Sequence, residues 1–172
     1  MTESMSLQEV LQQKGHITYK TRGTSMEPML RQDRDLVTIR RREAGERFME
    51  NDVVLYHRPS EPDRLILHRI VGVRDDGYRI IGDNCWTYED DIVDSDILGV
   101  LVSFIQNGRQ IELDSEEYLH YVEDLRKNEE DRIRNLKKNF EFRQKLKKLL
   151  GPLAGPARRL RNLLQRCGVL CR

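Results

Sequence analysis

The stretch Arg64-Leu-Ile-Leu-His-Arg-Ile-Val-Gly-Val73 is a nearly continuous run of leucine and β-branched residues, interrupted by one His-Arg pair. A run of this length and composition predicts a strand that is buried in a sheet. Comparable runs occur along the first two thirds of the chain, and we expect strands at residues 17–22, 35–40, 52–57, 64–73, 77–81, 97–105 and 109–113. Short strands at this spacing predict a mainly β (α+β) fold that contains a coiled β-sheet domain or a barrel.

Turn and capping signals define the N-terminal part of the chain. Asn107-Gly108 between two apolar runs is a strong hairpin signal. A short helix is expected at residues 5–14, with Ser6 as its N-cap and Gly15 as its end. These elements predict one β domain over residues 1–114.

The pattern changes to helical spacing after residue 114, which predicts a C-terminal helical extension over residues 115–172. Asp114 or Ser115 can cap its first helix. Apolar residues then recur at helical spacing, as Tyr118, Val122, Leu125, Ile133, Leu136 and Phe140. Gly151-Pro152 ends this pattern, and a last basic segment with leucines on one face follows at 157–166.

The net charge of +1 for the 172 residues conceals two oppositely charged parts. Residues 1–125 hold 15 Lys/Arg and 25 Asp/Glu, a charge of −10, whereas residues 126–172 hold 15 and 4, a charge of +11. A basic extension on an acidic body predicts an anionic partner for that extension. We favour docking on protein or an oligomer contact over peripheral contact with an anionic membrane surface. A nucleic-acid partner is disfavoured, since no known reader motif is present.

Cysteine usage and hydropathy bear on the compartment. The three cysteines, Cys85, Cys167 and Cys171, form neither a disulfide framework nor a zinc-ligand spacing. A reducing compartment is the simpler interpretation. The N-terminus lacks the basic and apolar regions of a signal peptide, and no apolar run reaches the roughly 20 residues of a membrane span. We therefore expect a cytoplasmic protein, with peripheral contact at the inner membrane surface as the alternative.

A candidate nucleophile stands in the turn Gly23-Thr-Ser-Met-Glu-Pro28. A serine hydroxyl attacks a carbonyl only when a base is adjacent and donors await the oxyanion. Gly23 permits a sharp turn and a close approach of substrate to the backbone N–H of Ser25. An ordinary Gly-Thr-Ser turn is the alternative, and local composition by itself favours it.

A candidate base is His68, in the middle of the quoted strand. Imidazole titrates near pH 6.5 and can accept a serine proton at neutral pH. A buried core histidine is the alternative for His68. Among the other histidines, His57 is interpreted as a surface residue, and His16 and His120 stand in polar settings.

These motifs, taken in order, resemble those of the signal peptidase family, whose wider superfamily includes the self-cleaving LexA-like repressors. The similarity covers roughly residues 17–105. It is closest to the endoplasmic-reticulum, archaeal and Gram-positive type, in which a His-Arg pair replaces the lysine of the bacterial type. The matching segments are Gly23-Thr-Ser-Met-Glu-Pro28, Arg31-Gln-Asp33-Arg-Asp35-Leu-Val37, Asn51-Asp52-Val-Val54, Leu67-His68-Arg69-Ile70-Val71-Gly72-Val73, Gly82-Asp83-Asn84 and Ile97-Leu-Gly99-Val100.

The resemblance implies a LexA/signal peptidase-like coiled sheet and a serine endopeptidase that needs no cofactor and no metal. Ser25 would be the nucleophile, His68 its general base and Asp83 a supporting acid. A second acid follows in the family, and Glu89 and Asp90 both stand at about the right offset. The backbone N–H of Ser25 would serve the oxyanion, while Gly23 replaces the side-chain hydroxyl donor of the bacterial type.

The chain departs from the family in having no hydrophobic helix before Ser25. We therefore expect a peptide or protein precursor as substrate, cleaved at small residues while extended against a strand edge. Arg69 should point away from His68, because side chains alternate along a strand, and should pair with a carboxylate such as Asp83. One rival is a catalytically inactive member that binds peptides in the same groove. A LexA-like regulator is the other, although a helix-turn-helix is missing from the sequence.

Overall fold

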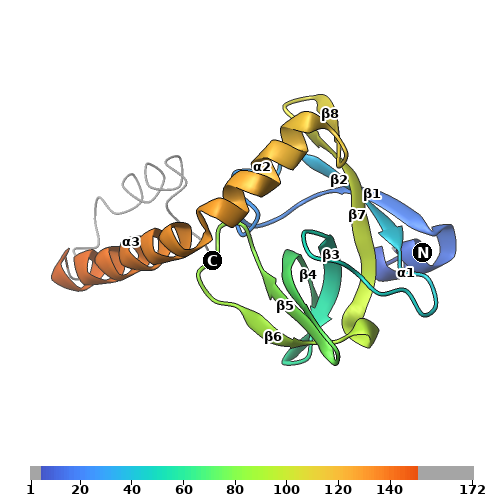
Figure 1. The fold of residues 1–172 in the computed structure, drawn as a ribbon, viewed down its shortest axis with the longest axis horizontal. Helices are drawn as coiled ribbons and strands as arrows, with labels where there is room; N and C mark the ends of the chain where they lie inside the picture. The colour runs from blue at the N-terminus through green and yellow to red at the C-terminus, as the bar shows by residue number, and fades with distance from the viewer. Residues whose placement is uncertain (1–4, 151–172) are drawn as a thin grey trace.

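The computed structural model describes residues 5–150, which form one antiparallel sheet flanked by helices (Figure 1). The α-helices are α1 (Leu7–Lys14), α2 (Glu116–Lys127) and α3 (Glu129–Leu150), and a 3₁₀ turn, η1, covers Asp94–Asp96. The strands are β1 (His16–Lys20), β2 (Leu36–Arg41), β3 (Val53–Arg58), β4 (Glu61–Arg74), β5 (Gly77–Ile81), β6 (Glu89–Ile92), β7 (Ile97–Gln106) and β8 (Arg109–Glu112). The expectation of a mainly β, α+β fold is confirmed.

The sheet has the strand order β1-β2-β7-β3-β4-β5-β6, and β8 pairs with β7. Strand β7 therefore lies at the centre, hydrogen-bonded to β2 and β3, although some 40 residues or more separate it from each in sequence. Strands β1 and β6 lie at the two ends of the order, so each has one neighbouring strand. The loops that follow β1 and β5 carry the motifs around Ser25 and Asp83.

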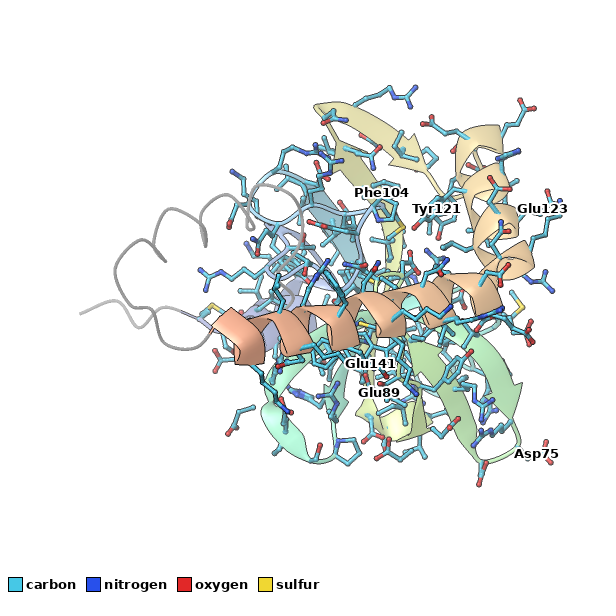
Figure 2. The ribbon with its side chains drawn as sticks, turned by 90° about the vertical axis from the view of Figure 1, so that its left-hand side faces the viewer. Asp75, Glu89, Phe104, Tyr121, Glu123 and Glu141 are labelled. Atoms are coloured by element: carbon cyan, nitrogen blue, oxygen red, sulfur yellow. The ribbon has the colours of Figure 1, made fainter. Side chains whose placement is uncertain are left out.

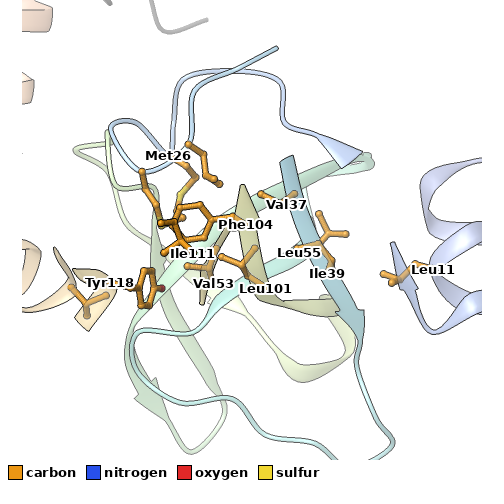
Figure 3. Packing of buried hydrophobic residues seen from close by; sticks show 13 residues of the cluster. Leu11, Met26, Val37, Ile39, Val53, Leu55, Leu101, Phe104, Ile111 and Tyr118 are labelled. Atoms are coloured by element: carbon orange, nitrogen blue, oxygen red, sulfur yellow. The ribbon is translucent and has the colours of Figure 1, made fainter. Parts of the chain in front are cut away.

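Strand β3 shows why the sheet must coil, because it is buried on both faces. Val53, Val54, Leu55 and Tyr56 are all at most 1% exposed, although neighbouring side chains in a strand point in opposite directions. Val53 and Leu55 belong to one apolar cluster, which also includes Leu11, Val37, Ile39, Leu101, Phe104, Tyr118 and Val122 (Figure 3). The other face packs into a second cluster with Ile70, Tyr78, Ile80 and Ile92.

Most of the expected strands are present with ends shifted by one or two residues. The largest difference is in β4, which starts three residues early because its hairpin turn is confined to Pro59 and Ser60. Strand β6 was not expected, since Glu-Asp-Asp-Ile is acidic and poor in strand formers. It forms because Tyr78 and Ile80 of β5 supply a pairing edge.

The helical ends follow the capping signals. Ser6 and Glu9 form a reciprocal capping box, and α1 ends at Gly15 with a φ of 75°. Ser115 caps α2 by accepting from the N–H of Tyr118. The continuous helical pattern after residue 115 is broken at Asn128, where α2 ends and α3 begins.

Helix α2 packs on the sheet through Tyr118 and Val122, and α3 follows it, with residues 129–140 in contact with the segment that connects β5 to β6. The expected basic segment at 157–166 lies outside the described residues. No helix within residues 5–150 is long and apolar enough to cross a bilayer.

Candidate active site

Ser25 lies, partly exposed, in the 15-residue loop that connects β1 to β2. Gly23 adopts a φ of +87°, so the turn before Ser25 uses the freedom that only glycine has at low cost. Met26, Met29 and Leu30 are at most 5% exposed and anchor the loop in the first apolar cluster. Ser25 is thereby held at the surface between buried neighbours.

The Gly82-Asp83-Asn84 segment packs directly against the backbone of this loop. The N–H of Asn84 donates to the carbonyl oxygen of Ser25 at 2.8 Å, and Asn84 Nδ2 donates to the carbonyl of Thr24 at 3.0 Å. A Cβ on Gly82 would lie 2.6 Å from the Ser25 oxygen and 2.9 Å from His68 Nε2. Glycine is therefore required at position 82, and the Ser25 backbone and the His68 ring meet there.

His68 is buried in β4, and its two ring nitrogens face different surroundings. Nδ1 lies 3.2 Å from Tyr56 Oη and 3.3 Å from Glu89 Oε1, while Nε2 faces Gly82 and the Ser25 loop. Within the described chain, no hydrogen bond joins the Ser25 hydroxyl to His68. The structure thus brings Ser25 and His68 to the same glycine, with the acid on the opposite edge of the imidazole.

Glu89 is fixed by three donors. Arg58 donates from Nε and one terminal nitrogen at 2.7 and 2.9 Å, and Tyr56 Oη donates at 2.8 Å. Burial works to raise the pKa of Glu89, but hydrogen bonds from Arg58, His68 and Tyr56 outweigh it and hold that pKa well below its usual range. Glu89 is therefore a carboxylate at neutral pH.

These contacts select the tautomer of a neutral His68 ring. Tyr56 donates its single proton to Glu89, so its oxygen can only accept toward Nδ1. Burial, with the charge of Glu89 next, raises the pKa of Tyr56, which keeps the phenol protonated. The neutral imidazole consequently carries its hydrogen on Nδ1 and presents a free electron pair at Nε2.

Asp83 and Asp90, also predicted as acids of the site, pair with arginines rather than with His68. Asp83 forms a bidentate, buried ion pair with Arg69 at 2.9 and 2.8 Å, as the alternation along β4 suggested for Arg69. Asp90 is 42% exposed and pairs with Arg74 and Arg79. Of the two alternatives for the second acid, Glu89 is the one beside His68.

The remaining histidines make contacts of other kinds. His57 Nε2 lies 3.2 Å from Gln8 of α1, and His120 pairs with Asp124 on the exposed side of α2. Within residues 5–150 no group of three or more potential metal-ligating side chains occurs. Neither the contact of His57 nor that of His120 involves a nucleophilic side chain.

Two residues of the site, Tyr56 and Arg58, were not predicted from the sequence. They alternate on β3 with His57 between them, and only the pairing of β3 with β4 brings Tyr56 to His68. Alternation would have placed Tyr56 and Arg58 on one face, but nothing in the sequence indicates that Glu89 returns to that face.

No known protein-family model matches this chain, and no curated protein matches it. We therefore infer its function from the residues around Ser25 and His68.

Proposed function

We propose that this protein is a serine endopeptidase of signal peptidase type, with Ser25 as nucleophile, His68 as general base and Glu89 as the acid that orients the base. One observation carries the proposal. His68 Nε2 and the Ser25 backbone meet at Gly82, while Nδ1 of the same ring faces a carboxylate held in its charged form.

The chemistry follows the template of a nucleophile, a base and an orienting acid. Ser25 Oγ attacks the scissile carbonyl while Nε2 accepts its proton, and the resulting imidazolium is stabilised by Glu89. That proton then passes to the leaving amine, and a water activated by the same nitrogen hydrolyses the acyl-enzyme. Burial of Glu89 strengthens its interaction with the imidazolium, because few waters screen it.

The predicted substrate is a peptide or protein precursor, cleaved next to small residues while lying extended. Two observations support this geometry. Among residues 5–150, strand β1 has one neighbouring strand, β2, and the loop with Ser25 begins directly after β1. A strand added at such an edge would continue toward Ser25. The LexA/signal peptidase-like fold and a signal-peptide-processing role belong to the same proposal.

A catalytically inactive peptide-binding or regulatory protein of the same fold is the second candidate. The observation that favours it is that the Ser25 hydroxyl is not hydrogen-bonded to His68 within the described residues. Hydrogen bonds of catalytic groups are often long without substrate and tighten on binding. The arrangement of Ser25 and His68 without substrate is therefore compatible with both candidates. An experiment that distinguishes them must measure the reactivity of the Ser25 hydroxyl.

A serine-directed fluorophosphonate probe distinguishes the two candidates. We expect labelling of the purified protein, located to Ser25 by mass spectrometry. Ser25→Ala and His68→Ala should each abolish it, whereas Ser60→Ala and His120→Ala, at exposed positions, should label like the parent. The binding module would be established if the parent is not labelled and if parent and Ser25→Ala bind small-residue peptides with equal affinity.

Partners of the basic C-terminal part are a separate proposal. Residues 126–172 carry a charge of +11 against −10 for the rest of the chain. We propose that this part contacts an acidic protein surface, including that of a second copy, in preference to an anionic membrane. Strongly salt-dependent association would support such an electrostatic contact.

A further inference from the structure

The segment that connects β5 to β6, residues 82–88, contacts the Ser25 loop on one side and both C-terminal helices on the other. In Figure 2, α3 crosses in front of the sheet, with Tyr121 above it and Glu89 below it in the view. Asn84 makes the contacts to Thr24 and Ser25 described above. Its neighbour Asp83 makes the contacts to the helices, so the two adjacent residues connect α2 and α3 to Ser25.

Asp83 is held by three elements at once. Arg69 of β4 binds its carboxylate, and Tyr121 of α2 donates to Oδ2 of the same group at 3.0 Å. Arg132 of α3 donates to its backbone carbonyl oxygen at 2.5 Å. The side chain and the main chain of Asp83 are thus fixed by separate donors, which leaves the peptide between residues 83 and 84 little freedom.

Helix α3 contacts the same segment at two further points. The rings of Trp86 and Phe140 lie 4.5 Å apart, and Tyr88 donates to Glu129 at 2.7 Å. These contacts, with Arg132 between them in sequence, extend over about three turns of α3. Such an extended contact makes α3 a support for the whole segment rather than a helix that touches it once.

The Ser25 loop, residues 21–35, has no strand or helix of its own; turn hydrogen bonds within the loop and contacts from outside hold it together. The buried side chains of Met26 and Met29 anchor the later part of the loop. The carbonyl groups of Thr24 and Ser25, before it, accept hydrogen bonds from Asn84. A displacement of about 1 Å at a reacting group can lower a rate on the order of 100-fold. The position of Asn84 therefore sets the position of Ser25 relative to His68.

We propose that α2 and α3 belong to the catalytic unit, with Tyr121 and Arg132 as positioning residues that act on Ser25 through Asp83 and Asn84. The effect of these residues on the reaction of Ser25 rests on the proposed function. The structural connection from the helices to the Ser25 loop does not. The C-terminal helices thus complete the site from a region of the chain that lies outside the resemblance to signal peptidases.

Two measurements on the full chain test the proposal. The first is the amide exchange rate of Asn84, followed by NMR, which reports the bond to Ser25 without any catalysis. The second is the rate constant for fluorophosphonate labelling of Ser25. The variants are Arg132→Ala, Arg132→Lys and Tyr121→Phe, of which the last keeps the buried ring. Arg134→Ala is the matched control, since Arg134 pairs with Asp131 on the exposed side of α3.

We expect Arg132→Ala and Tyr121→Phe to accelerate Asn84 exchange and to slow labelling, each on the order of tenfold. The pH profile of labelling should keep its shape, because the base and its acid are untouched. Arg132→Lys should recover part of both effects, and Arg134→Ala should match the parent. Unchanged Asn84 exchange in both variants, at a temperature where they are fully folded, overturns the proposal.

The two proposals fail in different ways. Faster Asn84 exchange in a protein that the probe never labels would retain the connection from the helices to the loop and reject the peptidase. Faster exchange with an unchanged labelling rate would retain the peptidase and reject Tyr121 and Arg132 as positioning residues.

Discussion

At the scale of single residues, the site depends on which acid faces the imidazole. Glu89 and Asp90 are neighbours in β6, so their side chains leave the strand on opposite sides. Glu89 turns inward to His68, Tyr56 and Arg58, while Asp90 turns outward to two arginines. The pairing of β6 with β5, rather than any property of the two acids, determines which of them faces His68.

Replacing Glu89 tests its role as orienting acid. Glu89→Gln keeps the shape but removes the charge that stabilises the imidazolium, and we expect labelling of Ser25 to slow by roughly 10²- to 10⁴-fold. Asp90→Asn should label like the parent, because its partners Arg74 and Arg79 lie on the surface. Equal labelling rates for Glu89→Gln and the parent would remove Glu89 from the mechanism.

The same substitution predicts a change in acid stability. The pKa of Glu89 is lower in the folded protein than its ordinary value of 4.5. Its stabilising contribution is therefore complete above about pH 4.5 and is lost as the pH falls toward the folded-state pKa. The difference in unfolding free energy between the parent and Glu89→Gln should shrink as the pH is lowered from 5 to 3, measured by urea titration. A difference that is constant over this range contradicts the assignment.

Gly82 gives a third prediction at this scale. In Gly82→Ala the new Cβ would stand 2.6 Å from the Ser25 oxygen and 2.9 Å from His68 Nε2, so the loop and the ring must separate. We expect a loss of about 1–3 kcal/mol in the free energy of unfolding, with much slower labelling. Gly72→Ala is the control, because its Cβ would meet only Arg79 Cβ at an ordinary 3.5 Å. If both variants behave alike, the close approach at Gly82 is not functional.

At the scale of elements, the features that could be predicted from the sequence are those that depend on residues close together in the chain. The apolar run around His68, the Asn107-Gly108 hairpin and the N-cap at Ser6 all rest on neighbours within a few residues, and all three are present. Strand β6 was missed because its stability comes from pairing with β5 and from arginines on other strands. Tyr56 and Arg58 were missed for the same reason, since their partner Glu89 lies more than 30 residues away.

Helix α2 illustrates a limit of dividing the chain by composition. The division at residue 114 follows the change from strand to helical spacing, yet Tyr118 and Val122 lie in the same cluster as Val37 and Leu101. The apolar face of α2 therefore completes the core of the β domain.

Paired substitutions on α2 measure this packing. Val122→Ala removes two buried methyl groups, and at about 0.8 kcal/mol each with a small cavity cost we expect a loss of about 2 kcal/mol. Leu119→Ala, on the same helix at 55% exposure, should change the free energy of unfolding by less than about 0.5 kcal/mol. Chemical denaturation of both variants gives the comparison. Similar losses would mean that α2 does not pack on the sheet in solution.

At the scale of the whole molecule, one buried ion pair joins parts that are far apart in sequence. Arg69 binds Asp83, the hydroxyl of Tyr118 and the carbonyl of Asn51, so β4, α2 and two loops meet at its guanidinium. The resemblance to signal peptidases drew attention to Asp83 as an acid. In the structure that carboxylate binds Arg69 of β4 and Tyr121 of α2, so it joins the helix to the sheet.

Asp83→Asn should therefore destabilise the entire fold as well as the site. The substitution leaves the Arg69 charge buried without its partner, for which we expect a loss of about 3–5 kcal/mol in the free energy of unfolding. Glu117→Gln breaks an exposed pair with Arg109 and should cost no more than about 1 kcal/mol. The double variant Arg69→Met with Asp83→Leu should recover a large part of the loss, because neither buried charge then remains. Urea titrations of the parent, of the single variants Arg69→Met and Asp83→Leu and of the double variant give the coupling energy. A double variant as unstable as the sum of its two single changes would show that the two side chains act independently.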